Sequence, residues 1–201
     1  MRLAVVNLKG GVAKSTTAVY LACGLAGHGR TLLIDADPQG SALTWSEIAD
    51  GLPAPVVALP IKDLHRRIDD VALGRDFVVI DTPPHNTAIV AGALRAADVA
   101  VTPIQPSMLD LNRLTSTIEL VEEIRAGHPL DMAALLVRTR PLTRSRAAVR
   151  KVLGKAGVRV LAAEVPQREA IAATFGTRLD PKDLGPYAPV LTELLEGRTD
   201  G

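Results

Sequence analysis

The sequence predicts an α/β fold: one domain over residues 1–201, with a mostly parallel, twisted sheet of about seven strands and helices on both faces. Short apolar runs recur along the chain, and most lack the polar alternation of a half-exposed strand, as expected for strands buried on both faces. These runs lie at residues 3–6, 31–34, 56–58, 77–80, 99–104, 132–137 and 158–165. Helical patterns separate them, which indicates right-handed crossovers.

The first helix is predicted directly after the loop that follows the first strand. Its apolar residues keep helical spacing at Ala18, Leu21, Ala22 and Leu25, and glycines at 27 and 29 end it. A later helix begins at Ser107, which forms the capping pattern S-x-x-D with Asp110. Its apolar positions continue at Leu111, Leu114, Ile118, Val121 and Ile124.

Composition excludes several classes of protein. Apolar residues make up 47% of the 201 residues and charged residues 22%, which is ordinary globular usage and excludes wholesale disorder. The single cysteine, Cys23, argues against a disulfide-built secreted protein, and no apolar stretch reaches about 18 residues. We therefore expect a cytoplasmic protein without a membrane segment. We also expect the tail at 196–201 to be frayed.

The loop after the first strand carries the chemistry of phosphate binding. Glycines between a strand and a helix expose backbone N–H groups, Lys14 supplies a cation and Ser15 supplies a hydroxyl that can ligate Mg²⁺. The strict pattern G-x-x-x-x-G-K-[ST] is broken by Leu8 and Ala13, and a positive φ at Ala13 would be strained. The loop predicts a P-loop NTPase whose nucleotide-binding residues are Lys9, Gly10, Gly11, Val12, Ala13, Lys14, Ser15 and Thr16.

Three acids follow predicted strands: Asp35 and Asp37 in LLIDADPQG, and Asp81 in FVVIDTPP. The carboxyl ends of parallel strands meet at one edge of a sheet, where ligands bind, so these acids should lie beside the loop. An Asp after four apolar residues is how a Walker B acid is presented to Mg²⁺. We expect Ser15, Asp35 and Asp81 to form the metal site.

Together, KGGVAKSTT, DADPQGSALTWS and VVIDTPP resemble the deviant Walker A, Walker A′ and Walker B motifs of the ParA/MinD ATPases. The segments TPIQPSMLDL and VPQRE resemble in particular the small ParF-type partition ATPases. This resemblance implies ATP and Mg²⁺ as cofactors and three catalytic residues. Lys9 would reach the partner subunit's phosphates, Lys14 would be the loop lysine, and Asp37 would orient the attacking water. Adenine contacts would come from Arg138, Pro166 and Gln167.

The resemblance also implies a function, namely ATP-dependent DNA partition. Its partners would be a second copy of the chain in an ATP-bound homodimer or a higher polymer, duplex DNA bound without sequence preference, and a small centromere-binding adaptor that stimulates hydrolysis. The protein would be nucleoid-associated. Two alternatives share the fold: a MinD-like membrane-cycling regulator of the division site, and an ATP-dependent synthetase or kinase acting on a small molecule.

A basic stretch stands out in a chain of net charge +1. Residues 138–168 hold nine Lys and Arg side chains and one acid, Glu164. A helix predicted over 143–157 would present basic residues on both flanks of an apolar stripe, where they could contact phosphates of a duplex. A solvated surface is the alternative. The predicted DNA-binding residues are Arg144, Arg146, Arg150, Lys151 and Lys155.

Overall fold

Seven parallel strands form one sheet in the computed structural model, which describes residues 1–141 and 143–197 and leaves the side chain of Arg144 undescribed. The strands are β1 (Arg2–Val5), β2 (Thr31–Asp35), β3 (Val56–Ala58), β4 (Phe77–Asp81), β5 (Val99–Ile104), β6 (Asp131–Thr139) and β7 (Arg159–Pro166). The predicted α/β class and the strand number are confirmed.

Eight helices connect or follow these strands in the described residues. They are α1 (Lys14–Leu25), α2 (Ser41–Ile48), α3 (Leu64–Val71), α4 (Thr87–Leu94), α5 (Met108–Arg125), α6 (Arg144–Lys155), α7 (Glu169–Ala172) and α8 (Tyr187–Glu196). The predicted frayed tail begins at Glu196, which is the last residue of α8; residues 198–201 lie outside the described residues.

The strand order is β3-β2-β4-β1-β5-β6-β7. From β1 the chain passes to β2 on one side of the sheet, whereas from β4 it passes to β5 on the other side of β1. The direction of winding therefore changes around β1. In open α/β sheets, such a change leaves a crevice at the carboxyl ends of the strands, and ligands bind there. The loop that follows β1 opens into this crevice.

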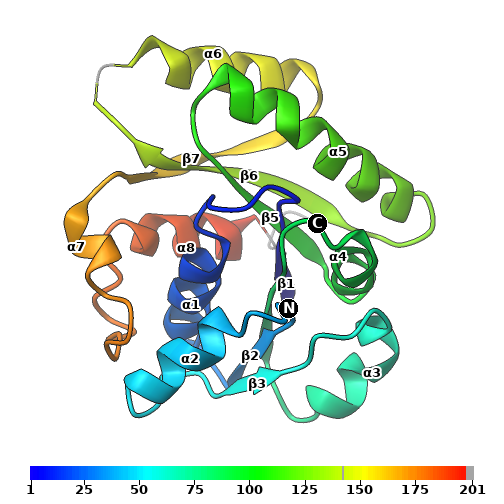
Figure 1. Ribbon diagram of the computed structural model, residues 1–201, viewed down its shortest axis with the longest axis vertical. Coiled ribbons are helices and arrows are strands. Elements are labelled where there is room, and N and C mark those ends of the chain that lie inside the picture. The colour runs from blue at the N-terminus through cyan, green and yellow to red at the C-terminus, as the bar shows by residue number, and fades with distance from the viewer. Residues whose placement is uncertain (142, 198–201) are drawn as a thin grey trace.

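Helices cover both faces of the sheet (Figure 1). On one face, α3, α4, α5 and α6 pack against strand residues such as Ala4, Ile34 and Ile80. On the other face, α1, α2 and α8 pack against the strand residues that alternate with those, such as Leu3, Val5 and Leu33. Consecutive residues of one strand thus enter opposite cores. This explains why the strand sequences show no polar alternation.

Helix α5 begins as the capping pattern predicts. Ser107 occupies the N-cap position, and its hydroxyl accepts a hydrogen bond from the backbone N–H of Asp110 at 3.1 Å. This bond uses the main chain of Asp110 and leaves its carboxylate free to contact another element. None of the helices in residues 1–141 and 143–197 is both long and apolar enough to span a bilayer.

Candidate functional site

The predicted phosphate loop lies between β1 and α1, in the crevice at the carboxyl edge of the sheet. Its backbone takes the left-handed conformation twice, at Gly11 (φ 73°) and at Ala13 (φ 60°). Glycine adopts this conformation freely, whereas for an alanine it costs about 1 kcal/mol or more. The strain expected at Ala13 is therefore present. Ala13 is also the N-cap residue of α1, so the strained residue sets how the first helical N–H groups face the crevice.

Lys14 extends into the loop that precedes it. Its side chain is buried, at 7% exposure, and Nζ donates a hydrogen bond to the carbonyl oxygen of Lys9 at 2.9 Å. Burial lowers the pKa of Lys14, while the nearby carboxylates of Asp81 and Asp37 act in the opposite direction. The ammonium is thus held between the loop and two acids, where a nucleotide phosphate would replace the carbonyl contact.

Asp81 ends β4, next to β1, and has no exposed surface. Neither carboxylate oxygen has a partner that meets hydrogen-bond geometry in the described residues. Burial raises the pKa of Asp81 to about 7, and the hydroxyl of Ser15 acts in the opposite direction. Unsatisfied buried oxygens next to a hydroxyl fit the hard oxygen ligands that Mg²⁺ prefers. Ser15 and Asp81 therefore suit the predicted metal site.

Asp35 and Asp37 are both buried but play different local roles. The two oxygens of Asp35 accept backbone N–H groups from Asp37 at 3.1 Å and from Leu43 at 2.9 Å. Asp35 thus ties the start of α2 to the end of β2. Burial raises its pKa, and these N–H groups oppose the shift. Asp37 accepts one backbone N–H, from Gln39 at 2.9 Å, so its second oxygen stays available for a water molecule.

The three acids come to one edge but do not form a metal cage. In the part of the chain that the structure describes, no group of three or more His, Cys, Asp or Glu side chains is close enough to hold an ion. A magnesium site here needs the Ser15 hydroxyl and nucleotide phosphate oxygens as further ligands. The backbone bonds of Asp35 make Asp81 the better direct or water-mediated ligand of the predicted pair.

Lys9 forms an ion pair with Asp110 of α5. The Asp110 side chain is only 5% exposed, and the Lys9 side chain is 22% exposed. The pair joins the phosphate loop to the first turn of α5, a contact between residues 101 positions apart. Lys9, the residue expected to act in a partner subunit, is therefore engaged within its own chain.

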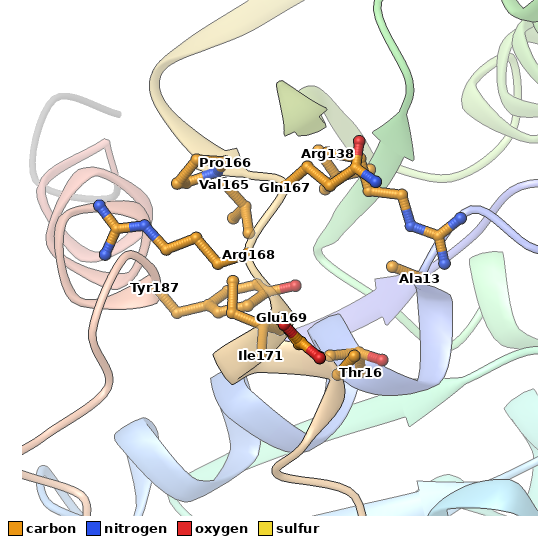
Figure 2. Close-up of a pocket in the computed structure, with 12 residues that line it drawn as sticks. Ala13, Thr16, Arg138, Val165, Pro166, Gln167, Arg168, Glu169, Ile171 and Tyr187 are labelled. Atoms are coloured by element: carbon orange, nitrogen blue, oxygen red, sulfur yellow. The ribbon is translucent and has the colours of Figure 1, made fainter. Parts of the chain in front are cut away.

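A pocket of about 400 Å³ lies beside the loop, where the base of a nucleotide is predicted, and we call it the base pocket (Figure 2). The predicted adenine contacts Arg138, Pro166 and Gln167 line it, together with Ala13 and Thr16 of the nucleotide loop. Figure 2 shows the Arg138 side chain reaching toward Ala13, and its backbone is left-handed, with φ 52°. The three residues thus converge on one pocket next to the phosphate loop.

Two walls of this pocket come from residues that lie outside the motifs found in the sequence. Ile171 and Ala172 of α7 form one wall and Tyr187 of α8 forms another. Tyr187 stacks on Tyr20 of α1, with ring centroids 4.4 Å apart, and its hydroxyl lies 3.1 Å from that of Thr17. The scarcity of aromatics, at 2% of residues, was the signal that could have marked Tyr187.

The predicted DNA-binding residues on α6 divide into two groups. Arg146 and Arg150 both form ion pairs with Glu164 of β7, at 2.7 and 2.8 Å. Arg150 also donates to the backbone carbonyls of Leu161 and Ala162, where the register of β7 against β6 shifts. Lys151 and Lys155 are exposed, and Arg144 opens the helix. Among the four side chains of this set that the structure describes, the two lysines are therefore the exposed charges.

Comparison with known proteins shows the family of this chain. The model of the CobQ/CobB/MinD/ParA nucleotide binding domain matches residues 3–180. Maintenance of carboxysome distribution protein A from Halothiobacillus neapolitanus is 37% identical over 172 residues, covering 83% of this chain and 79% of that protein. The chromosome-partitioning ATPase Soj of Thermus thermophilus is 34% identical over 157 residues, covering 63% of each.

The fold has solved counterparts. An ATP complex of a Cyanothece McdA variant superposes with a TM-score of 0.79 at 19% identity, covering 99% of this chain and 95% of that chain. At this identity the likeness shows the fold alone, whereas the family model covers most of the chain. The chain belongs to the CobQ/CobB/MinD/ParA nucleotide-binding domain family, and it is an ATPase.

Proposed function

We propose that this ATPase is the nucleotide-driven switch of a DNA partition system. One arrangement of residues supports the proposal. Lys9 and Lys14 flank the glycine loop, and at the same edge of the sheet one carboxylate oxygen of Asp37 is available to bind a water molecule. A single lysine suffices for a loop that only holds phosphates. The second lysine, placed at the mouth of the loop, suits contact with a nucleotide in another subunit.

Hydrolysis in such a site needs positioning and charge neutralisation rather than a covalent intermediate. Lys14 holds the β- and γ-phosphates, and Asp37 orients the attacking water. Ser15 and Asp81 would hold Mg²⁺, which would supply positive charge to neutralise the phosphate oxygens. Lys9 adds a cation from the partner subunit, in the manner of an arginine finger. Turnover is then linked to formation of the ATP-bound homodimer.

In this proposal, the ATP-bound dimer binds to DNA. The exposed Lys151 and Lys155 of α6, with Arg144 at its start, supply positive charge that binds backbone phosphates without reading sequence. A dimer presents two such helices on one object, so the second engages at high effective concentration. The protein would then associate with the nucleoid only in its ATP state. A small centromere-binding adaptor would stimulate hydrolysis and release it.

A second candidate function differs only in the cargo. The similarity to maintenance of carboxysome distribution protein A extends over most of this chain, which favours the distribution of a protein compartment along DNA by the same switch. The MinD-like membrane-cycling alternative needs a free amphipathic helix near the end of the chain. Helix α8 does not provide it, because Val190, Leu191 and Leu194 are buried.

The test combines nucleotide binding, assembly and DNA binding. Lys14→Ala should abolish Mg-ATP binding, because no other cation replaces a buried ammonium inside the loop. The parent should dimerise with a non-hydrolysable ATP analogue in size-exclusion runs, and should then bind random-sequence duplex more tightly than with ADP. Replacing Arg144, Lys151 and Lys155 by Ala should reduce the log–log salt slope of DNA binding by up to about 2–3 units per subunit.

A matched control removes the same charge elsewhere. The exposed arginines Arg66, Arg67 and Arg75 lie on or just after α3, away from α6 (Figure 1), and their replacement by Ala should leave the slope unchanged. Basal ATP hydrolysis should survive in both triple variants. A parent protein that binds ATP but not DNA would reject the partition function and the DNA-based distribution function together.

A further inference from the structure

A pocket lies where the start of the phosphate loop meets the start of α4 and the first half of α5, and we call it the α4–α5 pocket. Its volume is about 830 Å³. The polar side chains that line it are Lys9, His85, Thr87, Arg113 and Ser116, and none of its described lining residues is an Asp or a Glu. Basic side chains and hydroxyls without a competing acid are the groups that bind oxyanions. The lining therefore suits an anion.

Main-chain contacts hold the walls of this pocket together. The backbone N–H of Leu8 donates to the Thr117 hydroxyl of α5 at 3.1 Å, and the Leu8 carbonyl accepts the backbone N–H of His85 at 3.1 Å. Thr117 is fully buried. His85 takes the left-handed conformation, with φ 56°, which is uncommon for a residue with a side chain. Leu8 thus joins the loop, α5 and the segment before α4, so the pocket is built into the fold.

Arg113 supplies the available charge of the α4–α5 pocket. It is exposed, and no acid within residues 1–141 and 143–197 forms an ion pair with it. The charge of Lys9, by contrast, is compensated by Asp110. Ser116 follows Arg113 by three positions on α5, so the two side chains lie on the same side of the helix. A guanidinium and a hydroxyl are therefore placed to bind one anion together.

The α4–α5 pocket and the base pocket lie at opposite ends of the phosphate loop. The base pocket is lined by Ala13 and Thr16, where the loop passes into α1. The α4–α5 pocket is lined by Lys9 and Gly10, where the loop begins, and α4 and α5 cover the face of the sheet opposite to α8 (Figure 1). The terminal phosphate of a nucleotide is the part farthest from its base. A nucleotide that extends from the base pocket along the loop therefore directs its terminal phosphate toward Lys9 and Gly10.

We propose that the α4–α5 pocket binds the inorganic phosphate that ATP hydrolysis releases. The proposal rests on the ATPase activity of the chain and is independent of the partition function proposed above. The planar fork of Arg113 matches two phosphate oxygens, and the hydroxyls of Thr87 and Ser116 donate to the others. The pocket is larger than one phosphate ion, so the ion keeps part of its hydration there and can leave, as a product must.

Phosphate in this pocket would slow the next turnover. The incoming ATP brings its terminal phosphate to the same end of the loop, and two anions that lie close together repel each other. Product release limits the turnover of many enzymes. Added phosphate should therefore inhibit hydrolysis, and the inhibition should depend on Arg113.

The first experiment follows phosphate binding by NMR on the ¹⁵N-labelled protein in the presence of Mg-ADP. Inorganic phosphate should shift the amide signals of Thr87 and Ser116 in a saturable manner, whereas sodium chloride at the same ionic strength should not. Arg113→Ala should weaken this binding about ten-fold or more. Arg113→Lys should weaken it less, because the ammonium keeps the charge without the fork.

Arg66→Ala is the matched control. It removes an exposed arginine of α3 that also forms no ion pair with an acid in the part of the chain that the structure describes. The second experiment measures ATP turnover through ADP formation, with phosphate added at the concentration that saturates the NMR shifts of the parent. Relative to its own rate without added phosphate, turnover should fall in the parent and in Arg66→Ala, and should fall much less in Arg113→Ala.

Several results would overturn the proposal. If the Thr87 and Ser116 signals do not shift, or shift equally with chloride, the pocket binds no phosphate specifically. Shifts confined to Gly11 and Ser15 would place the phosphate in the nucleotide loop only. Binding or inhibition that is equal in the parent and in Arg113→Ala would exclude Arg113, and phosphate that binds the parent without inhibiting it would exclude the product role. None of these results bears on DNA binding, so the partition function stands or fails separately.

Discussion

The ammonium of Lys9 and the carboxylate of Asp110 form an ion pair within one chain, between the phosphate loop and the first turn of α5. A lysine that acts on a partner subunit's nucleotide must first leave this carboxylate. The two contacts compete, because one ammonium cannot satisfy both anions. In the proposed switch, the intramolecular pair would therefore stabilise the monomer against the ATP-bound dimer.

Asp110→Asn should shift that balance toward the dimer. The variant keeps the backbone N–H that binds Ser107, so the cap of α5 survives, while the charge that holds Lys9 is lost. An ion pair worth about 1 kcal/mol in each of the two subunits corresponds to roughly 30-fold tighter ATP-dependent dimerisation, and basal turnover should rise with the dimer population. Sedimentation or light scattering over a concentration series would measure it. Asp69→Asn removes an exposed ion pair with Arg2 and serves as the control.

Asp37→Ala and Lys9→Ala should separate chemistry from assembly. Asp37→Ala should keep ATP and the dimer but lose nearly all hydrolysis, since the phosphate contacts of Lys14 remain. Lys9→Ala should bind ATP as a monomer and turn over poorly. Size-exclusion runs with a non-hydrolysable analogue, combined with phosphate-release assays, distinguish the two variants. A Lys9→Ala dimer with normal turnover would exclude a role for this lysine in the partner subunit.

Local patterns predicted the fold and the phosphate loop well, for a physical reason. Strand burial, helix capping and glycine loops depend on residues a few positions apart, so the strand at 99–104 and the cap at Ser107 match the structure. The loop was equally readable, because a strand, glycines, Lys14 and a helix follow one another directly. The sequence indicated only that a positive φ at Ala13 would be strained, and the structure supplies that φ, at 60°.

Long-range pairings were not readable from the sequence. Asp110 was predicted as the acid of a capping pattern, yet its carboxylate binds a lysine 101 positions away. Trp45 is buried, and its indole N–H donates to the carbonyl of Thr177, 132 positions away, at 2.8 Å. A helical wheel cannot show that Arg150 reaches Glu164 on the next strand. Such contacts depend on how helices and strands pack in three dimensions, which local sequence patterns do not specify.

Metal-free protein should lose stability as the pH rises, through Asp81. The pKa of this buried carboxyl is about 7 in the folded state and about 4 when unfolded. Folding thus favours the protonated form, so this contribution is fully present below about pH 4 and is lost as the pH rises to about 7.

Asp81→Asn removes this ionisation. In urea titrations with a chelator, the variant should be more stable than the parent by at least about 1 kcal/mol at pH 8, with the difference vanishing near pH 4. At pH 8 with Mg-ATP, the parent should instead be more stable than the variant. The cation favours the ionised carboxylate, so Mg-ATP binds well only to the parent. A variant no more stable than the parent at pH 8 would contradict the raised pKa.

Ala13→Gly should stabilise the protein while preserving nucleotide binding. Ala13 holds φ 60° at the N-cap of α1, and glycine relieves that strain, although it also gains freedom in the unfolded chain. The net gain should be about 0.5–1 kcal/mol in the free energy of unfolding, measured in urea. ATP affinity should change little, because the backbone N–H groups keep their directions.

Gly11→Ala is the matched opposite of this change. Gly11 has φ 73°, and no atom lies within 4 Å of the position that a Cβ would take. Any loss of stability in that variant therefore reports backbone strain rather than a clash, and it should be about 1 kcal/mol. If Ala13→Gly raises the free energy of unfolding and Gly11→Ala lowers it, the alanine side chain is the cause of the strain at position 13. If Ala13→Gly destabilises the protein instead, the alanine methyl contributes packing beside the base pocket that outweighs its strain.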